Sequence, residues 1–191
     1  MLLKIFSTPV LIDTVELDKI EIKNKNFSQK WQGDVHTSHG YTNELNSEGA
    51  DELLKVITKN LDEIIPFKYQ LEIQNVWQNK YEIGHSQDRH MHTRAHFSFI
   101  VYENVDEGKT VFVHPINDLL MEKYAYMGIK GDEAEHVFQM NFEPKLKKGS
   151  IVIFPSYLEH YVRKNTKPGS TISGNISITA IDTSFFSQVK V

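Results

Sequence analysis

After Phe67 the sequence adopts a period of two, and this alternation constrains the fold more than any other feature. Successive residues of a β-strand point to opposite faces of a sheet, so the repeat predicts strands. A chain with many short strands must bury its apolar faces in a sandwich or a barrel of sheets. The predicted strands span residues 69–78, 96–103, 110–114, 136–143, 150–154 and 171–182.

One segment before the strands has helical periodicity instead. It begins at Ser47, a residue type favoured at a helix N-cap, and Pro66 stops it. We therefore expect one helix that supports the sheets, and edge strands and loops in residues 1–45. The apolar residues at three- and four-residue spacing are Ala50, Leu53, Leu54, Ile57, Leu61 and Ile64.

The composition narrows the classes of protein and of site. The 191 residues contain no cysteine, which excludes disulfide scaffolds, thiolate zinc sites and cysteine nucleophiles. Any metal must therefore be bound by His, Asp or Glu. With 21 basic and 25 acidic residues, the chain lacks the basic excess typical of nucleic-acid-binding proteins, so no such partner is expected. Asp13 and Glu16 interrupt the apolar start, which predicts a soluble, cytoplasmic protein without a membrane span.

The last predicted strand has two different faces. Ile172 and Ile176 belong to an apolar face, whereas Ser173 and Asn175 belong to a polar one. A polar face is solvated when the strand lies at an outer edge, and it lines a cavity when the sheet closes on itself. The sequence allows both arrangements.

Three of the nine histidines fall within seven positions, and two of these, His90 and His92, are separated by one residue. On an extended strand, residues i and i+2 share a face, so the pair suits metal chelation, although exposed strand histidines are common without it. In LKKGSIVIFPSYLEHYV, a Gly turn and an apolar strand lead to His160, which would supply a third ligand. Three ligands leave about three positions open on a six-coordinate ion, and imidazoles favour iron, copper, nickel or zinc.

Four parts of the sequence occur in an order that resembles a known family. They are NVWQNKYEIG, the His90 and His92 pair, HFSFIVYENVDEGKTVFVHP and KKGSIVIFPSYLEH. Together they resemble the prolyl-hydroxylase-like oxygenases that depend on 2-oxoglutarate and iron(II). The resemblance is strongest to the small oxygenases of bacteria and bacteriophages, including cyanophages, and it extends over residues 31–182.

The resemblance implies a mainly β fold, the double-stranded β-helix (a jelly roll, as in cupins), backed by one or more helices. We expect a single domain over residues 1–191. N-terminal strands and the supporting helix would occupy residues 1–66, and the double-stranded β-helix would occupy residues 67–183.

The resemblance also implies a reaction. Iron(II) would be bound by His90, His92 and His160, the expected catalytic residues. The enzyme would consume 2-oxoglutarate and molecular oxygen and hydroxylate an unactivated C–H bond. A protein or peptide side chain is the expected substrate, in the cytoplasm of a bacterium or of a phage-infected host.

The sequence departs from the family pattern in two respects, one at a metal ligand and one at the cosubstrate anchor. His92 stands where many members of the wider superfamily have Asp, so Asp88 is considered as an alternative ligand or an outer partner of the site. The family usually places Arg or Lys about nine or ten residues after the distal histidine, where it binds the far carboxylate of 2-oxoglutarate. Here these positions are Gly169 and Ser170.

Other residues near the expected site must then bind the cosubstrate. Arg163 and Lys167 are close in sequence and could supply the positive charge. Ser173 and Asn175 would form hydrogen bonds with the cosubstrate or substrate, and Tyr102 could offer its phenol, although each fits an ordinary strand position equally well.

Two further hypotheses remain open from the sequence. The first is a three-histidine, cupin-like dioxygenase or metal-binding protein that does not use 2-oxoglutarate. The second is a non-catalytic β-helix with a role in assembly. Trp31 and Trp77 are expected in the core, and His36 and His39 in loops.

Overall fold

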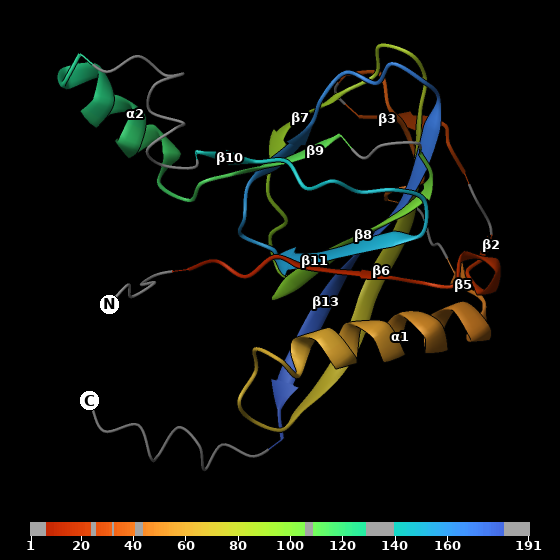
Figure 1. Ribbon diagram of the computed structural model, residues 1–191. Helices are drawn as coiled ribbons and strands as arrows, with labels where there is room; N and C mark the ends of the chain where they lie inside the picture. The colour runs from red at the N-terminus through yellow and green to blue at the C-terminus, as the bar shows by residue number, and fades with distance from the viewer. Residues whose placement is uncertain are drawn as a thin grey trace.

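Two antiparallel sheets face each other, and helix α1 lies beneath the larger one (Figure 1). The computed structural model describes residues 7–23, 26–31, 33–40, 44–105, 109–128 and 140–181, without the side chains of residues 124–126. The large sheet has seven strands in the order β1 (Leu11–Thr14), β11 (Ser150–Pro155), β8 (Phe97–Asn104), β13 (Gly169–Ala180), β6 (Tyr69–Tyr81), β4 (His36–Thr37) and β3 (Gln29–Lys30). The small sheet has four strands in the order β10 (Asn141–Phe142), β9 (Thr110–Val113), β12 (His160–Val162) and β7 (Gln87–His90).

From β6 to β13 the chain winds between the two sheets. Strands β6, β8, β11 and β13 belong to the large sheet. Between them in the sequence come β7, the pair β9 and β10, and β12, which belong to the small sheet. This winding is the double-stranded β-helix, so the predicted mainly β fold is confirmed. A further pair, β2 (Ile22–Lys23) and β5 (Glu44–Leu45), and the short 3-10 helix η1 (Leu17–Lys19) precede α1.

Most of the predicted strands are present close to their predicted bounds. Strands β7 and β12 were missed, because β7 (QDRH) contains no apolar residue and β12 (HYV) is only three residues long. Of the predicted strand 136–143, residues 136–139 lie outside the described residues, and only Asn141–Phe142 form a strand. Residues 182 and 183 also lie outside them.

Helix α1 (Ser47–Leu61) confirms the predicted helix, with two corrections. The N-cap is Asn46 rather than Ser47, and the Asn46 side chain holds the preceding segment instead of the helix. Its Nδ2 donates to the Lys19 carbonyl oxygen at 2.8 Å, and its Oδ1 accepts from the Glu21 backbone N–H at 2.9 Å. The helix ends at Leu61, before the predicted Ile64.

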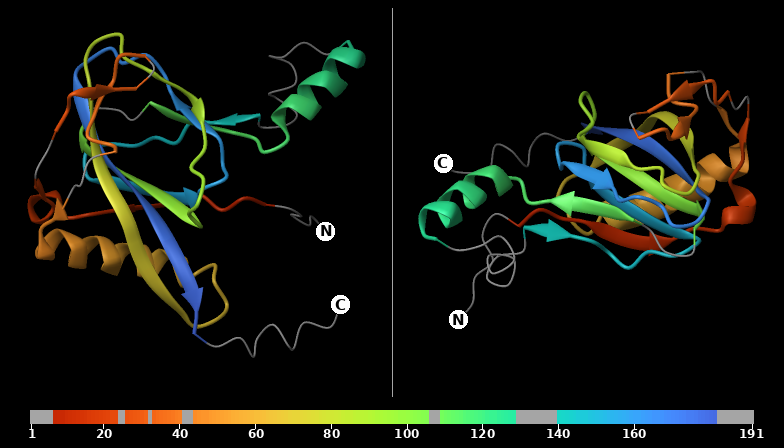
Figure 2. Two further views of the ribbon diagram at one scale, coloured as in Figure 1. Left: turned by 180° about the vertical axis from the view of Figure 1, so that it is seen from behind. Right: turned by 90° about the horizontal axis from the view of Figure 1, so that it is seen from above.

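A second helix, α2 (Asn117–Tyr126), was not predicted. It projects away from the sheets (Figures 1 and 2) and leaves Leu119 and Met121 exposed. Its apolar residues are not gathered along one face of the helix, so its sequence lacks the periodicity on which helix prediction rests. No helix in the described part of the chain is both long and apolar enough to cross a membrane.

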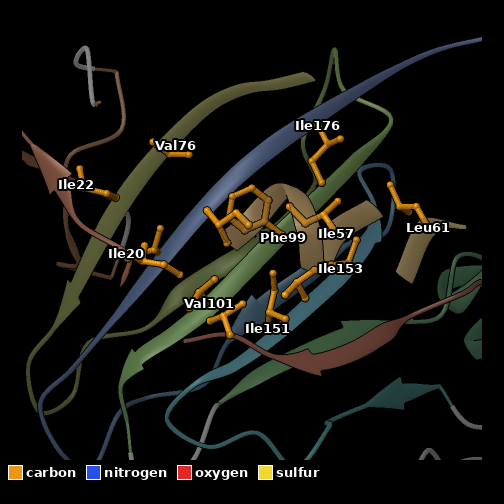
Figure 3. Packing of buried hydrophobic residues seen from close by; sticks show 14 residues of the cluster. Ile20, Ile22, Ile57, Leu61, Val76, Phe99, Val101, Ile151, Ile153 and Ile176 are labelled. Carbon is orange, nitrogen blue, oxygen red and sulfur yellow. The ribbon is translucent and has the colours of Figure 1, made fainter. Parts of the chain in front are cut away.

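The main core lies between α1 and one face of the large sheet (Figure 3). Ile57 of the helix packs among Phe99, Ile153 and Ile176, all fully buried. The apolar face predicted for β13 therefore faces α1. Its polar face points the other way, into a cavity between the sheets, so the lumen-lining arrangement is the one that occurs.

Candidate metal centre

Three histidines meet where β7 and β12 pair. His90 at the end of β7 is the direct cross-strand partner of His160 at the start of β12, and their ring centroids are 4.3 Å apart. His92 follows two residues after His90, with its ring 5.2 Å from that of His160. One ligand nitrogen from each histidine lies within 4.8 Å of the other two. The sequence-predicted trio is therefore brought together.

Hydrogen bonds in the turn after β11 position His160 and His92. The apolar strand β11 ends at Pro155, whose carbonyl oxygen accepts from the Leu158 N–H at 2.9 Å. This tight turn sends His160 into the small sheet. The His92 N–H donates to the Ser156 carbonyl oxygen at 2.9 Å, which fixes the segment after β7 against the same turn.

Each imidazole has its Nδ1 beside an oxygen acceptor. The acceptor is the Asp88 carbonyl for His90 (2.7 Å), the Leu158 carbonyl for His160 (3.0 Å) and the Asn175 Oδ1 for His92 (2.7 Å). An Nδ1 that donates to oxygen carries the proton, so the Nε2 of each ring keeps a free lone pair. A cluster of three imidazoles, each with one nitrogen available, forms a donor set that fits a first-row divalent metal.

Burial keeps the imidazoles of His160 and His92 neutral. His160 is only 2% exposed, and its burial, reinforced by repulsion from His90 and His92, holds its pKa well below the ordinary value. Burial likewise lowers the pKa of His92 to about 4, against the opposing effect of its hydrogen bond to Asn175. A neutral imidazole is the form that binds metal, so at neutral pH no proton competes for these two rings.

Asn175 lines the cavity and also contacts His92, a contact that was not predicted. Its binding of cosubstrate or substrate stays a prediction. Its Oδ1 accepts from both His92 Nδ1 and the buried Ser98 hydroxyl, the latter at 2.9 Å. Ser98 Oγ also lies 2.9 Å from Ser156 Oγ. Through this network the large sheet orients His92, a candidate metal ligand that follows β7 of the small sheet.

Asp88, the alternative ligand, is outside the cluster. Its carboxylate is exposed and does not belong to the three-residue group found in the described part of the chain. The contribution of Asp88 is instead its backbone carbonyl, the acceptor for His90 Nδ1.

The cluster lies in a cavity of about 550 Å³ between the two sheets. Tyr102, Ser173 and Asn175 line it as predicted. Arg163 and Lys167 do not: both are exposed, and Arg163 Nε donates to Glu143 Oε2 at 3.0 Å. The other lining residues that bear on the site are Lys30, Trp31, His39, Trp77, Lys109, Thr110 and Thr171.

The aromatic residues of the cavity differ from their predicted places. Trp31 was expected in the core, but it is 36% exposed and lines the cavity, whereas Trp77 is buried as expected. His39 lies between them, with ring centroids 4.9 Å from Trp31 and 4.8 Å from Trp77, and Trp77 in turn lies 5.5 Å from His92. His36 belongs to strand β4 rather than to a loop. Nothing in the local sequence indicates that these distant segments meet.

A family described as "Putative 2OG-Fe(II) oxygenase" matches residues 75–176, more than half of the 191-residue chain. A search of curated proteins found no match. Three solved structures represent the similar folds. An oxidoreductase of the 2OG-Fe(II) oxygenase family from Burkholderia pseudomallei is 12% identical, with a TM-score of 0.49, covering 89% of this chain and 73% of that one.

The second is a prolyl-4-hydroxylase from Pseudomonas putida, 15% identical, with a TM-score of 0.46, covering 80% of this chain and 76% of that one. The third is HygX from Streptomyces hygroscopicus with nickel, 2-oxoglutarate and hygromycin B bound. It is 10% identical, with a TM-score of 0.49, covering 89% of this chain and 83% of that one.

The geometry predicts which side chain is indispensable for metal binding. His160→Ala removes one of three ligands and should weaken iron(II) affinity by more than the roughly 10–100-fold that loss of an outer partner costs. Asp88→Ala keeps the backbone carbonyl and should leave the affinity unchanged. Anaerobic calorimetric titration with iron(II) measures both. An equal loss in the two variants would mean that the Asp88 carboxylate is a ligand.

The Asn175 amide should matter for metal binding although it is not a ligand. Asn175→Ala leaves His92 Nδ1 without its acceptor, and we expect iron(II) affinity to fall about 10–100-fold. Ser173→Ala is the matched control, because Ser173 lies on the same face two residues away, whereas the described partners of His92 Nδ1 are Asn175 and Ser98. The same titration applies, and equal affinities for the two variants would contradict the positioning role.

Proposed function

The chain belongs to the 2OG-Fe(II) oxygenase family, and on that premise we propose that it hydroxylates an unactivated C–H bond of a protein or peptide side chain. Iron(II) is the metal of this family and 2-oxoglutarate its cosubstrate. The observation that supports the proposal best is the convergence of three imidazole ligand nitrogens inside the cavity between the sheets.

The residues around the cavity would have distinct roles in metal binding and in substrate binding. His90, His92 and His160 hold the ion through Nε2, while the hydrogen bonds on Nδ1 fix the direction of each ring. When bound, iron(II) supplies, with 2-oxoglutarate and oxygen, the oxidising power for C–H hydroxylation. Ser173 faces the same cavity and can donate a hydrogen bond to the cosubstrate or the substrate.

The rim of the cavity supports a peptide substrate. Trp31 and Met91 both line the cavity and are 36% and 49% exposed, so they offer apolar surface to a chain that reaches in from outside. The volume of about 550 Å³ lies well above the lower end of small-molecule pockets, about 300 Å³, which leaves room for a side chain beside the cosubstrate.

A second candidate function is a three-histidine dioxygenase that does not use 2-oxoglutarate. Two observations favour it. The ligand set is neutral, without the carboxylate of the two-histidine triad, and neither Gly169 nor Ser170 supplies a cation. The two functions differ in whether bound iron recruits 2-oxoglutarate.

Anaerobic titration separates the two candidates. Iron(II) followed by 2-oxoglutarate should produce the visible charge-transfer band of a chelated complex, because the three histidines leave adjacent positions for the oxo acid. His160→Ala should abolish the band, whereas His114→Ala, which removes a histidine outside the cluster, should not. Tight iron binding without a band in the unaltered protein would rule out the main proposal and favour the second.

The proposed substrate class is tested by turnover. Mixed short peptides should accelerate the release of succinate from 2-oxoglutarate, while the corresponding free amino acids should not, because only a peptide extends from the metal to the rim at Trp31. Trp31→Ala should reduce the acceleration and leave the slow release without peptide unchanged. Acceleration by free amino acids alone would contradict a peptide substrate.

A further inference from the structure

The strand that would normally anchor the far carboxylate of 2-oxoglutarate cannot do so in this chain. Along β13, Thr171, Ser173 and Asn175 line the cavity, so position 169 would be the next one on that face. A Cβ at Gly169 would lie 2.8 Å from the Asn104 carbonyl oxygen and 3.1 Å from Val105 Cγ1. Position 169 therefore cannot accept a side chain unless the backbone moves.

Position 170 is engaged elsewhere. The Ser170 hydroxyl donates to Glu103 Oε2 at 2.8 Å and does not line the cavity. The opposite side of the cavity must then provide the positive charge that a dicarboxylate requires.

The described residues that line the cavity include two lysines, Lys30 and Lys109. Lys30 lies on the outer strand β3, where its side chain is 53% exposed and its Nζ is 3.8 Å from Asp34 Oδ1. Lys109 is half-buried and immediately precedes β9, and its carbonyl oxygen accepts from the Arg163 N–H at 3.0 Å. Because Lys109 is the less solvated of the two, its charge acts more strongly inside the cavity.

A buried pair of hydroxyls adjoins Lys109. Thr110 and Tyr102 both line the cavity and are 2% and 1% exposed. The Tyr102 phenol donates to Thr110 Oγ1 at 2.6 Å, which leaves the Thr110 hydrogen to donate in turn. Burial raises the pKa of the Tyr102 phenol, so it remains protonated and keeps this direction. The Thr110 hydroxyl can therefore donate a hydrogen bond to an anion in the cavity.

The strand register sets a suitable separation from the metal. In the pairing of β9 with β12, Phe112 is opposite His160 and Thr110 is opposite Val162. Thr110 thus lies two residues from the level of the metal ligand, or roughly 7 Å along the strand, and Lys109 lies roughly 10 Å away. In 2-oxoglutarate, two methylene groups separate the chelating oxo acid from the second carboxylate, a span compatible with these positions.

We infer that Lys109, together with the Thr110 hydroxyl supported by Tyr102, binds the distal carboxylate of 2-oxoglutarate in place of a cation on β13. The inference rests on the proposed function and adds the residue that selects the cosubstrate. It moves the anchor from the large sheet to the small one, on the same β9–β12 ladder that carries His160.

The test compares two oxo acids on the intact, iron(II)-loaded protein without oxygen. 2-Oxopentanoate has the oxo acid and chain length of 2-oxoglutarate but lacks the second carboxylate. The unaltered protein should bind 2-oxoglutarate about 10–100-fold more tightly, the range expected for hydrogen bonds to a charged group. Calorimetry and the charge-transfer band both report the Kd, so no turnover is needed.

Lys109→Met should remove most of this preference by weakening 2-oxoglutarate alone, whereas Lys30→Met, the matched control, should retain it. Thr110→Val should reduce the preference in part, and Lys109→Arg should largely restore it. If Lys109→Met binds 2-oxoglutarate as the unaltered protein does, the inference is overturned and the proposed function stands. If the unaltered protein binds iron(II) but neither oxo acid, the proposed function fails and the inference fails with it.

Discussion

The pairing of β7 with β12 is the constraint on which the rest of the site depends. It sets His90 directly opposite His160 in neighbouring strands, and a slip of one residue would turn one of the two imidazoles to the opposite face. Both strands are short, so the pairing needs support from outside the ladder. Arg89 and Glu159, the residues just before the two histidines, form an ion pair, and Arg89 Nη1 also reaches Asp118 Oδ1 of α2 at 3.1 Å. The first of these ion pairs links β7, which carries His90, to the start of β12, which carries His160.

The large sheet contributes to the same site from the other wall of the cavity. Strand β13 carries apolar residues toward α1 and polar residues toward the candidate metal centre. Because these residues alternate, one strand contributes to both the core and the cavity. Gly174 belongs to the apolar set, where a Cβ would lie 2.5 Å from the Phe99 ring, and the next residue, Asn175, orients His92. Packing on α1 and orientation of the metal ligand are therefore coupled through one backbone, because displacement of Gly174 would displace Asn175.

Sequence reasoning was most successful where a pattern extends over many residues. The helix at Ser47–Leu61 and the long strands follow from apolar periodicity, and the three clustered histidines follow from spacing and family resemblance. Prediction from the sequence failed where the place of a side chain depends on contacts between segments that are distant in the chain. Neither the contact of Asn175 with His92 nor the place of Lys109 in the cavity has a local signature, because both arise when the sheets face each other. Arg163 and Lys167 were chosen for proximity in sequence, which the strand geometry does not convert into proximity in space.

The tight packing of Gly169 against the Asn104 carbonyl also limits how this protein can diverge. A cation can be introduced at position 169 only if the Asn104 backbone and the Val105 side chain move first. With Lys109 as the inferred anchor beside β9, an anchor at position 169 of β13 would be an alternative arrangement that the backbone of this chain does not accommodate.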